Sequence, residues 1–194
     1  MTDGWTKLAL GADVVQMLLP HRRPFLLVDA IDAIALGPRP MLRARKMVSA
    51  NEPVFEGHFP GLSLWPGVYT IEGLGQTTNL LDLIRGLIAA AATESATPEQ
   101  VLEALRGLEK RSRPGPGKPS ADEARLVAAL GAPKSRIGYA GAIDVKLIEP
   151  VFAGCVIDYR VTQTHVVANA KRFEVEACVD DRPVARGTVT SATP

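Results

Sequence analysis

Residues 51–76 read NEPVFEGHFPGLSLWPGVYTIEGLGQ, and the chain changes character within this stretch. Its first part is rich in proline and glycine, which predicts a long loop from Asn51 to Pro66. From Gly67 onward, apolar residues recur at spacings of three and four, which predicts a helix that continues to about Ala92. Pro66 directly precedes this helix, where its fixed φ and missing N–H cost little.

Strand patterns lie on both sides of this helix. Residues 25–34 are apolar and residues 41–48 alternate, so a strand pair is expected before it. A short helix from Asp13 to Leu19 is expected ahead of the pair. Further strands are expected after the long helix, at residues 137–148, 156–167, 172–179 and 184–190, with a hairpin turn at 180–183. This order predicts an α+β fold in which one long central helix packs against a curved antiparallel sheet.

Residues 93–134 differ in composition from the rest of the chain. Thr97 and Ser120 are each placed to cap a short helix, and a Pro/Gly-rich linker at residues 113–119 separates the two. We interpret residues 93–134 as an insertion into a single domain that spans residues 1–194, with a core at about 12–92 and 136–192. A lid, an oligomer contact, a docking surface and a solvated excursion are all open for it.

Composition excludes several classes of function. The 194 residues carry 22 Lys and Arg against 21 Asp and Glu, which argues against a nucleic-acid partner and a polybasic membrane surface. No stretch is apolar enough to span a bilayer, and the N-terminus lacks a signal-peptide pattern, so a cytoplasmic protein is expected. The two cysteines are too few for a disulfide framework or a cysteine-ligated zinc site, and no metal is expected.

The loop and the start of the long helix bring together groups suited to acid–base chemistry. His58 lies in the rigid loop and is the candidate base. Glu72 lies one turn into the helix among apolar neighbours, which favour a protonated carboxyl, and Gln76 shares its face. The helix start at Gly67 and Val68 offers backbone N–H groups for a developing oxyanion. This set suits proton removal α to a carbonyl, with loss or gain of a β-hydroxyl.

Each residue also has an ordinary structural interpretation. A loop histidine is more often structural than catalytic, and a single glutamate on a helix is often a solvated or helix-pairing residue. The pattern alone is therefore only a hint of chemistry. His21 is expected to support loop packing, and His165 to be a surface or structural residue. Some of the scattered basic residues are candidates for steering an acidic partner, although ordinary solvated charge is the better explanation for any one of them: Arg22, Arg23, Lys46, Lys134 and Arg136.

Several blocks resemble the FabZ family of (3R)-hydroxyacyl-[acyl carrier protein] dehydratases. LPHRRPFLLVD at residues 19–29 resembles the family's opening motif. NEP at 51–53, GHFPG at 57–61 and PGV at 66–68 resemble its loop, and Ile71, Glu72 and Gln76 resemble its helix motif. GYAGAID at 138–144 and PVFAG at 150–154 resemble a later strand and turn. The resemblance covers about residues 12–92 and 136–192.

The resemblance implies a hotdog fold and a role for each matching residue. His58 is similar to the family's catalytic histidine, and Glu72 to its catalytic acid, which a second protomer supplies across the interface. The backbone N–H of Gly67 is similar to the thioester contact. A glutamate rather than an aspartate at position 72 favours simple dehydration. The implied partners are acyl carrier protein and a second copy of the chain, with a higher oligomer left open, and no cofactor is implied.

Two departures from the family concern the substrate tunnel. Gly73 and Gly75 stand where the family usually has alanine or a larger apolar residue, and each weakens the helix by roughly 1 kcal/mol relative to alanine. We expect these glycines to widen the acyl tunnel or to let a partner helix approach. Phe59 and Pro60 are further candidates for lining the tunnel.

Other functions stay open at this point. A hotdog thioesterase needs a carboxylate that activates water, and the His-Phe-Pro loop argues against it. A non-catalytic module that binds or senses acyl thioesters is the second alternative, and the presence of both polar residues argues against it. A dehydratase of a polyketide or polyene pathway shares the same chemistry. The sequence leaves open the acyl chain length and whether His58 or Glu72 protonates the departing hydroxyl.

Overall fold

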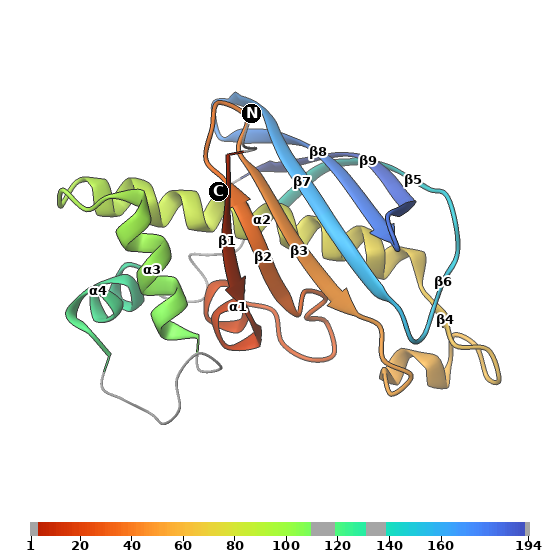
Figure 1. Ribbon diagram of the computed structural model, residues 1–194. Coiled ribbons are helices and arrows are strands. Elements are labelled where there is room, and N and C mark those ends of the chain that lie inside the picture. Colours follow the sequence, from red (N-terminus) through yellow and green to blue (C-terminus); the bar gives the residue numbers. More distant parts are fainter. Residues whose placement is uncertain (1–3, 110–118, 131–138, 193–194) are drawn as a thin grey trace.

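The computed structural model describes residues 4–109, 119–130 and 139–192, and its main feature is a curved antiparallel sheet (Figure 1). Within those residues, seven strands follow one another in the order β1-β2-β3-β7-β8-β9-β5, each antiparallel to its neighbours. They are β1 (Trp5–Leu10), β2 (Ala30–Ala35), β3 (Met41–Met47), β5 (Tyr139–Leu147), β7 (Val156–Val167), β8 (Ala170–Val179) and β9 (Arg182–Ala192). The strands β4 (Leu64–Trp65) and β6 (Val151–Phe152) form a separate pair.

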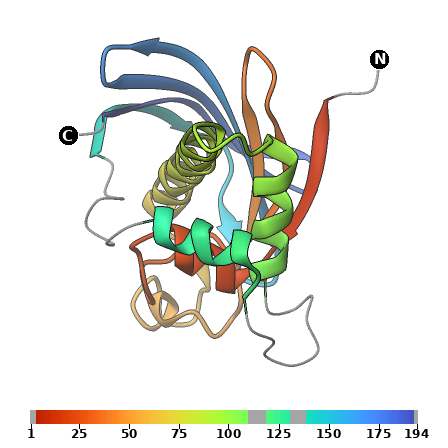
Figure 2. The same cartoon turned by 90° about the vertical axis from the view of Figure 1, so that its left-hand side faces the viewer.

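The long helix α2 (Gly67–Ala92) lies within the curve of the sheet (Figure 2). Its residues Leu74, Leu81 and Ile84 are fully buried and share one core with Tyr159 and Phe173 of the sheet. This is the predicted arrangement of one central helix against a curved antiparallel sheet. No helix of the described residues combines the length and the apolar character that crossing a membrane requires.

Strand β7 shows why the sheet curves around α2. Its buried residues alternate with partly exposed ones, since Ile157, Tyr159, Val161 and Gln163 all point to one face. Burial of these side chains against α2 fixes the register, because a slip of one residue would turn them to the outer face. The bounds of β7 are those predicted from the sequence.

The remaining helices are short: α1 (Ala12–Leu18), the 3₁₀ helix η1 (Pro53–Glu56), α3 (Pro98–Leu108) and α4 (Ala121–Ala129). The predicted caps at Thr97 and Ser120 are confirmed, and each is a complete capping box. Helix α3 packs on β1, α1 and α2. Its apolar face is part of the core, and the buried Glu109 accepts a hydrogen bond from the backbone N–H of Gly11. The predicted insertion therefore contributes α3 to the packing of the domain.

Several boundaries differ from those expected. Strand β2 begins at Ala30 rather than Phe25, and β1 was not predicted. The first helix is capped at Gly11 without a side-chain bond, so Asp13 is not its cap. The loop at residues 51–66 contains η1 and β4. Most of the expected linker at 113–119, and residues 131–138, lie outside the described residues.

Candidate active site

His58 is oriented by its own loop. Its Nδ1 lies 2.8 Å from the carbonyl oxygen of Leu64, and its ring stacks on Phe59 with 4.2 Å between centroids. Because a carbonyl only accepts hydrogen bonds, Nδ1 carries the proton in the neutral ring. The other nitrogen, Nε2, then has a free lone pair. This arrangement prepares Nε2 to act as a base.

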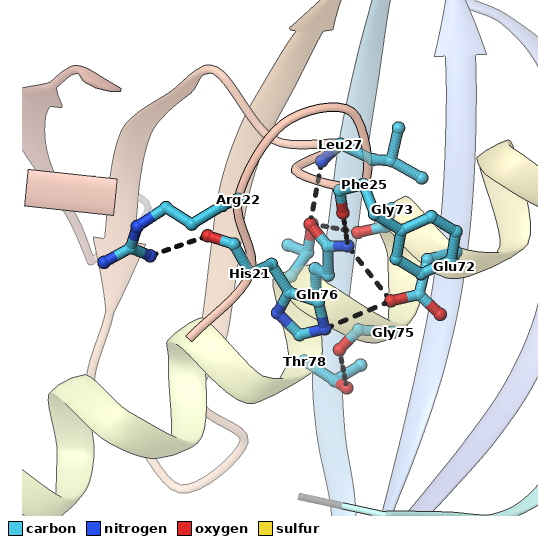
Figure 3. A network of polar contacts seen from close by, with 10 residues as sticks. His21, Arg22, Phe25, Leu27, Glu72, Gly73, Gly75, Gln76 and Thr78 are labelled. Carbon is cyan, nitrogen blue, oxygen red and sulfur yellow. Dashed lines mark hydrogen bonds and ion pairs between the residues drawn. The ribbon is translucent and has the colours of Figure 1, made fainter. Parts of the chain in front are cut away.

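Glu72 is held by Gln76, one turn further along α2. The Nε2 of Gln76 donates to Glu72 Oε1 at 3.0 Å and also to the carbonyl oxygen of Phe25 at 2.8 Å. Its Oε1 accepts from the backbone N–H of Leu27 at 2.9 Å. Gln76 itself is only 2% exposed. Its contact with Leu27 is buried, and those with Phe25 and Glu72 are partly buried (Figure 3). The amide thus fastens the segment before β2 to α2 and orients the carboxyl.

A buried lysine links the opening segment to the loop that bears His58. Lys46 Nζ lies 2.6 Å from Glu52 Oε1 and 3.2 Å from Asp29 Oδ2, and the Lys46 side chain is 7% exposed. The same Asp29 oxygen accepts from the backbone N–H of Met47 at 2.7 Å. Lys46 is therefore engaged in buried ion pairs with Asp29 and Glu52. Its charge is not available to steer an acidic partner.

A small cavity lies beside Glu72. It measures about 100 Å³ and is bounded by α2, by the opening segment and by the strands β5 and β9. Its lining includes Gly75 and Gln76 of α2, and also His21, whose Nε2 lies 3.5 Å from Glu72 Oε1. Burial lowers the pKa of His21, with Glu72 opposing and Arg22 adding to the shift. The carboxyl therefore has polar neighbours, rather than the apolar surroundings expected from the helix sequence.

The two glycines of the helix motif have different environments. A Cβ on Gly73 would lie 2.1 Å from the hydroxyl oxygen of Tyr159, so the ring of Tyr159 fills the space at this position. Gly75 has no neighbouring atom where its Cβ would be, and it lines the cavity. Gly67, at the start of α2, is packed closely by Leu147 of β5. Val68 beside it is 65% exposed.

The structure brings together some of the expected site residues and separates others. Glu72, Gln76 and Gly75 share the cavity, whereas its lining does not include His58. The polar contacts of His58 in the described residues stay within its loop, and Phe59 is 48% exposed there. The contact between His21 and Glu72 is the feature of the site that the sequence did not predict. The motif at residues 19–29 was the available signal, but the sequence does not show that this segment folds back onto Glu72.

The fold and this arrangement of residues can now be compared with known proteins. Residues 19–104 match the model of the FabA family, described as a FabA-like domain, and the chain has the hotdog fold. The chain is similar to proteins named 3-hydroxyacyl-[acyl-carrier-protein] dehydratase FabZ. That of Polynucleobacter necessarius subsp. necessarius is 49% identical over 76 residues, which are 39% of this chain and 50% of the relative. That of Dichelobacter nodosus is 38% identical over 101 residues, which are 52% of this chain and 64% of the relative. The chain thus spans about half to just under two thirds of the length of these relatives.

A solved structure supports the fold over the greater part of the chain. The dehydratase heterocomplex ApeI:P of Xenorhabdus doucetiae matches with a TM-score of 0.53 and 15% identity. The match covers 93% of this chain and 90% of that chain. The structural match therefore extends well beyond residues 19–104, the segment that matches the family model.

Proposed function

We propose that the protein dehydrates (3R)-3-hydroxyacyl thioesters on acyl carrier protein to trans-2-enoyl thioesters. The observation that carries this proposal is the carboxyl of Glu72, oriented by Gln76 at the edge of a cavity, on the same helix whose N-terminus follows the loop of His58. The similarity to proteins named FabZ supports it. Fatty-acid synthesis or a related polyketide or polyene pathway is the proposed setting.

His58 is the base in this reaction. Its Nε2 takes the proton from C2 of the acyl chain, since Nδ1 is engaged with the carbonyl of Leu64. Negative charge then develops on the thioester oxygen. The first N–H groups of α2, at Gly67 and Val68, have no partner within the helix and stabilise this charge.

Glu72 is the acid. The electrons of the C2–H bond form the C2=C3 double bond while the C3–O bond breaks, and the proton of Glu72 leaves with the hydroxyl as water. Gln76 orients Glu72 for this step by its hydrogen bond to Oε1. The acyl chain extends into the cavity beside Glu72, which Gly75 leaves open. Phe59 and Pro60 do not line this cavity within one chain.

The proposed active unit is a homodimer. Strand β5 is at the end of the sheet, and its side chains Tyr139, Ile143 and Leu147 are 59%, 52% and 48% exposed. Val68 of α2 is a further exposed apolar side chain, next in the chain to Gly67, against which Leu147 packs. An unpaired apolar edge invites pairing with another strand. Within one chain, Glu72 and His58 share no cavity. In the proposed dimer, Glu72 of one chain lies close to His58 of the other.

The proposed partners are acyl carrier protein and the hydroxyacyl thioester it carries, with no cofactor. The relatives are named for a substrate bound to acyl carrier protein. Arg22 and Arg23 directly follow His21 in the chain and are candidates for contacting an acidic carrier. Cys155 and Cys178 are free thiols, which suits the proposed cytoplasmic location.

The proposal is tested by incubating the purified protein with (3R)-3-hydroxyacyl carrier proteins of increasing chain length. We expect enoyl thioester to form, and the reverse hydration to occur from the enoyl carrier protein. Release of free carrier thiol without enoyl product would identify a thioesterase. Tight binding without either product would identify a binding module. Each of these two results would reject the proposed dehydration.

A further inference from the structure

His21 and Gln76 both contact the same carboxyl oxygen of Glu72. Its Nε2 is 3.5 Å from Glu72 Oε1, the same oxygen that accepts the hydrogen bond of Gln76 Nε2 at 3.0 Å (Figure 3). The side chains of His21 and Glu72 are 29% and 34% exposed, and both line the cavity. Two nitrogen groups from different parts of the chain thus converge on one carboxylate oxygen.

The surroundings of the ring fix which nitrogen carries its proton. His21 Nδ1 is buried and has no hydrogen-bond partner among the described residues. A buried N–H without a partner is costly, so in the neutral ring the proton lies on Nε2, which faces the acceptor Glu72 Oε1. Three further groups act on the ring or face the cavity, namely Arg22 beside it in the chain, Asp82 of α2 and Tyr139 of β5. Burial lowers the pKa of His21, so the ring is uncharged near neutral pH.

The turn that carries His21 is itself held in place. Arg22 Nη1 donates to the carbonyl oxygens of Leu19 at 2.9 Å and His21 at 2.7 Å. The backbone N–H of Phe25 donates to the carbonyl of Arg22 at 2.8 Å. Gln76 then fixes Phe25 to α2. The ring is therefore presented to Glu72 by a closed set of hydrogen bonds.

We propose that His21 is a positioning residue that, together with Gln76, reserves Glu72 Oε1 as a hydrogen-bond acceptor and so confines the acid proton of Glu72 to Oε2. This role rests on the proposed dehydration. An oxygen that accepts two N–H groups cannot also carry the transferable proton. The contact of 3.5 Å is at the outer limit of a hydrogen bond, and such contacts shorten when substrate closes an active site.

The test compares His21→Gln with His21→Asn. The amide nitrogen of glutamine can occupy the place of Nε2, whereas that of asparagine reaches only the place of Nδ1. We expect His21→Gln to keep kcat within about 3-fold of the unsubstituted protein, and His21→Asn to lower kcat by about 10- to 100-fold with little change in KM. The acidic limb of the pH profile of kcat should shift in His21→Asn but not in His165→Asn, a control on the exposed end of β7.

Two further readouts separate a positioning role from a packing role. Thermal unfolding shows whether the two variants are equally folded, and ¹⁵N NMR of the imidazole should find His21 protonated on Nε2. Equal kcat in both variants, or an Nδ1-protonated ring, would reject the role of His21 while leaving the dehydration intact. Absence of enoyl product from the unsubstituted protein would instead reject the proposed function, and the role of His21 with it.

Discussion

Gln76 Nε2 donates to Glu72 Oε1 at 3.0 Å while Gln76 Oε1 accepts from the backbone N–H of Leu27. One buried amide thus connects the proposed acid to the segment that precedes β2. The candidate site and the local fold therefore depend on the same side chain.

Replacing Gln76 with leucine should reduce both stability and activity. The N–H of Leu27 would be left unpaired in the interior, which costs about 1–3 kcal/mol. The carbonyl of Phe25 would lose its partner at a partly buried position, which adds less. Urea unfolding at equilibrium measures this loss. Gln76→Glu is the comparison, because it keeps the acceptor for Leu27 but places a second carboxyl beside Glu72. If Gln76→Leu were as stable as the unsubstituted protein, the hydrogen bonds of the Gln76 amide would not contribute to stability.

Lys46→Met should destabilise the fold by about 3 kcal/mol, the low end for a broken buried ion pair, because Asp29 and Glu52 keep some contact with water. The two carboxylates would face one another without the ammonium between them. The free energy of unfolding measures the effect. Arg39→Met is the matched control, since its ion pair with Glu174 is exposed on both sides. Equal losses in the two variants would contradict the buried role of Lys46.

Gly73→Ala and Gly86→Ala should change stability in opposite directions. The new methyl at position 73 would overlap the hydroxyl of Tyr159, and such overpacking costs about 1–3 kcal/mol. The methyl at position 86 meets no atom within 4 Å, so the helix gains about 1 kcal/mol from the higher propensity of alanine. Thermal and urea unfolding of both variants provide the measurement. Stabilisation by Gly73→Ala would mean that Tyr159 does not occupy that space.

The lowered pKa of His21 makes a prediction about pH. Its ordinary value is 6.5, and burial places the folded-state pKa below this. The unfolded chain therefore binds the proton more readily, so stability is lost as the pH falls below 6.5 toward the folded-state pKa. His21→Gln lacks this group, and its free energy of unfolding should fall less between about pH 7.5 and about pH 5.5. An equal fall in both proteins would show that His21 titrates normally.

Much of the fold could be predicted because local periodicity and burial agree in α2, α3 and β7. The start of β2 could not, since the backbone groups of Phe25 and Leu27 bond to the side chain of Gln76 rather than to a neighbouring strand. The same contact explains the miss at His21. Local sequence marks the segment as apolar, but its position against Glu72 is set by a hydrogen bond across 51 residues of chain.

The central claim is that His58 and Glu72 act together in a dehydration site that two chains complete. Its most direct test is the rate of enoyl-thioester formation by His58→Ala, by Glu72→Gln, and by the two variants unfolded together and refolded as a mixture. We predict that each variant alone loses activity by orders of magnitude. The mixture should recover about a quarter of the wild-type rate, since about half of the dimers are mixed and each has one intact site. No recovery in a mixture shown to contain mixed dimers, or full activity in either variant alone, would contradict this account.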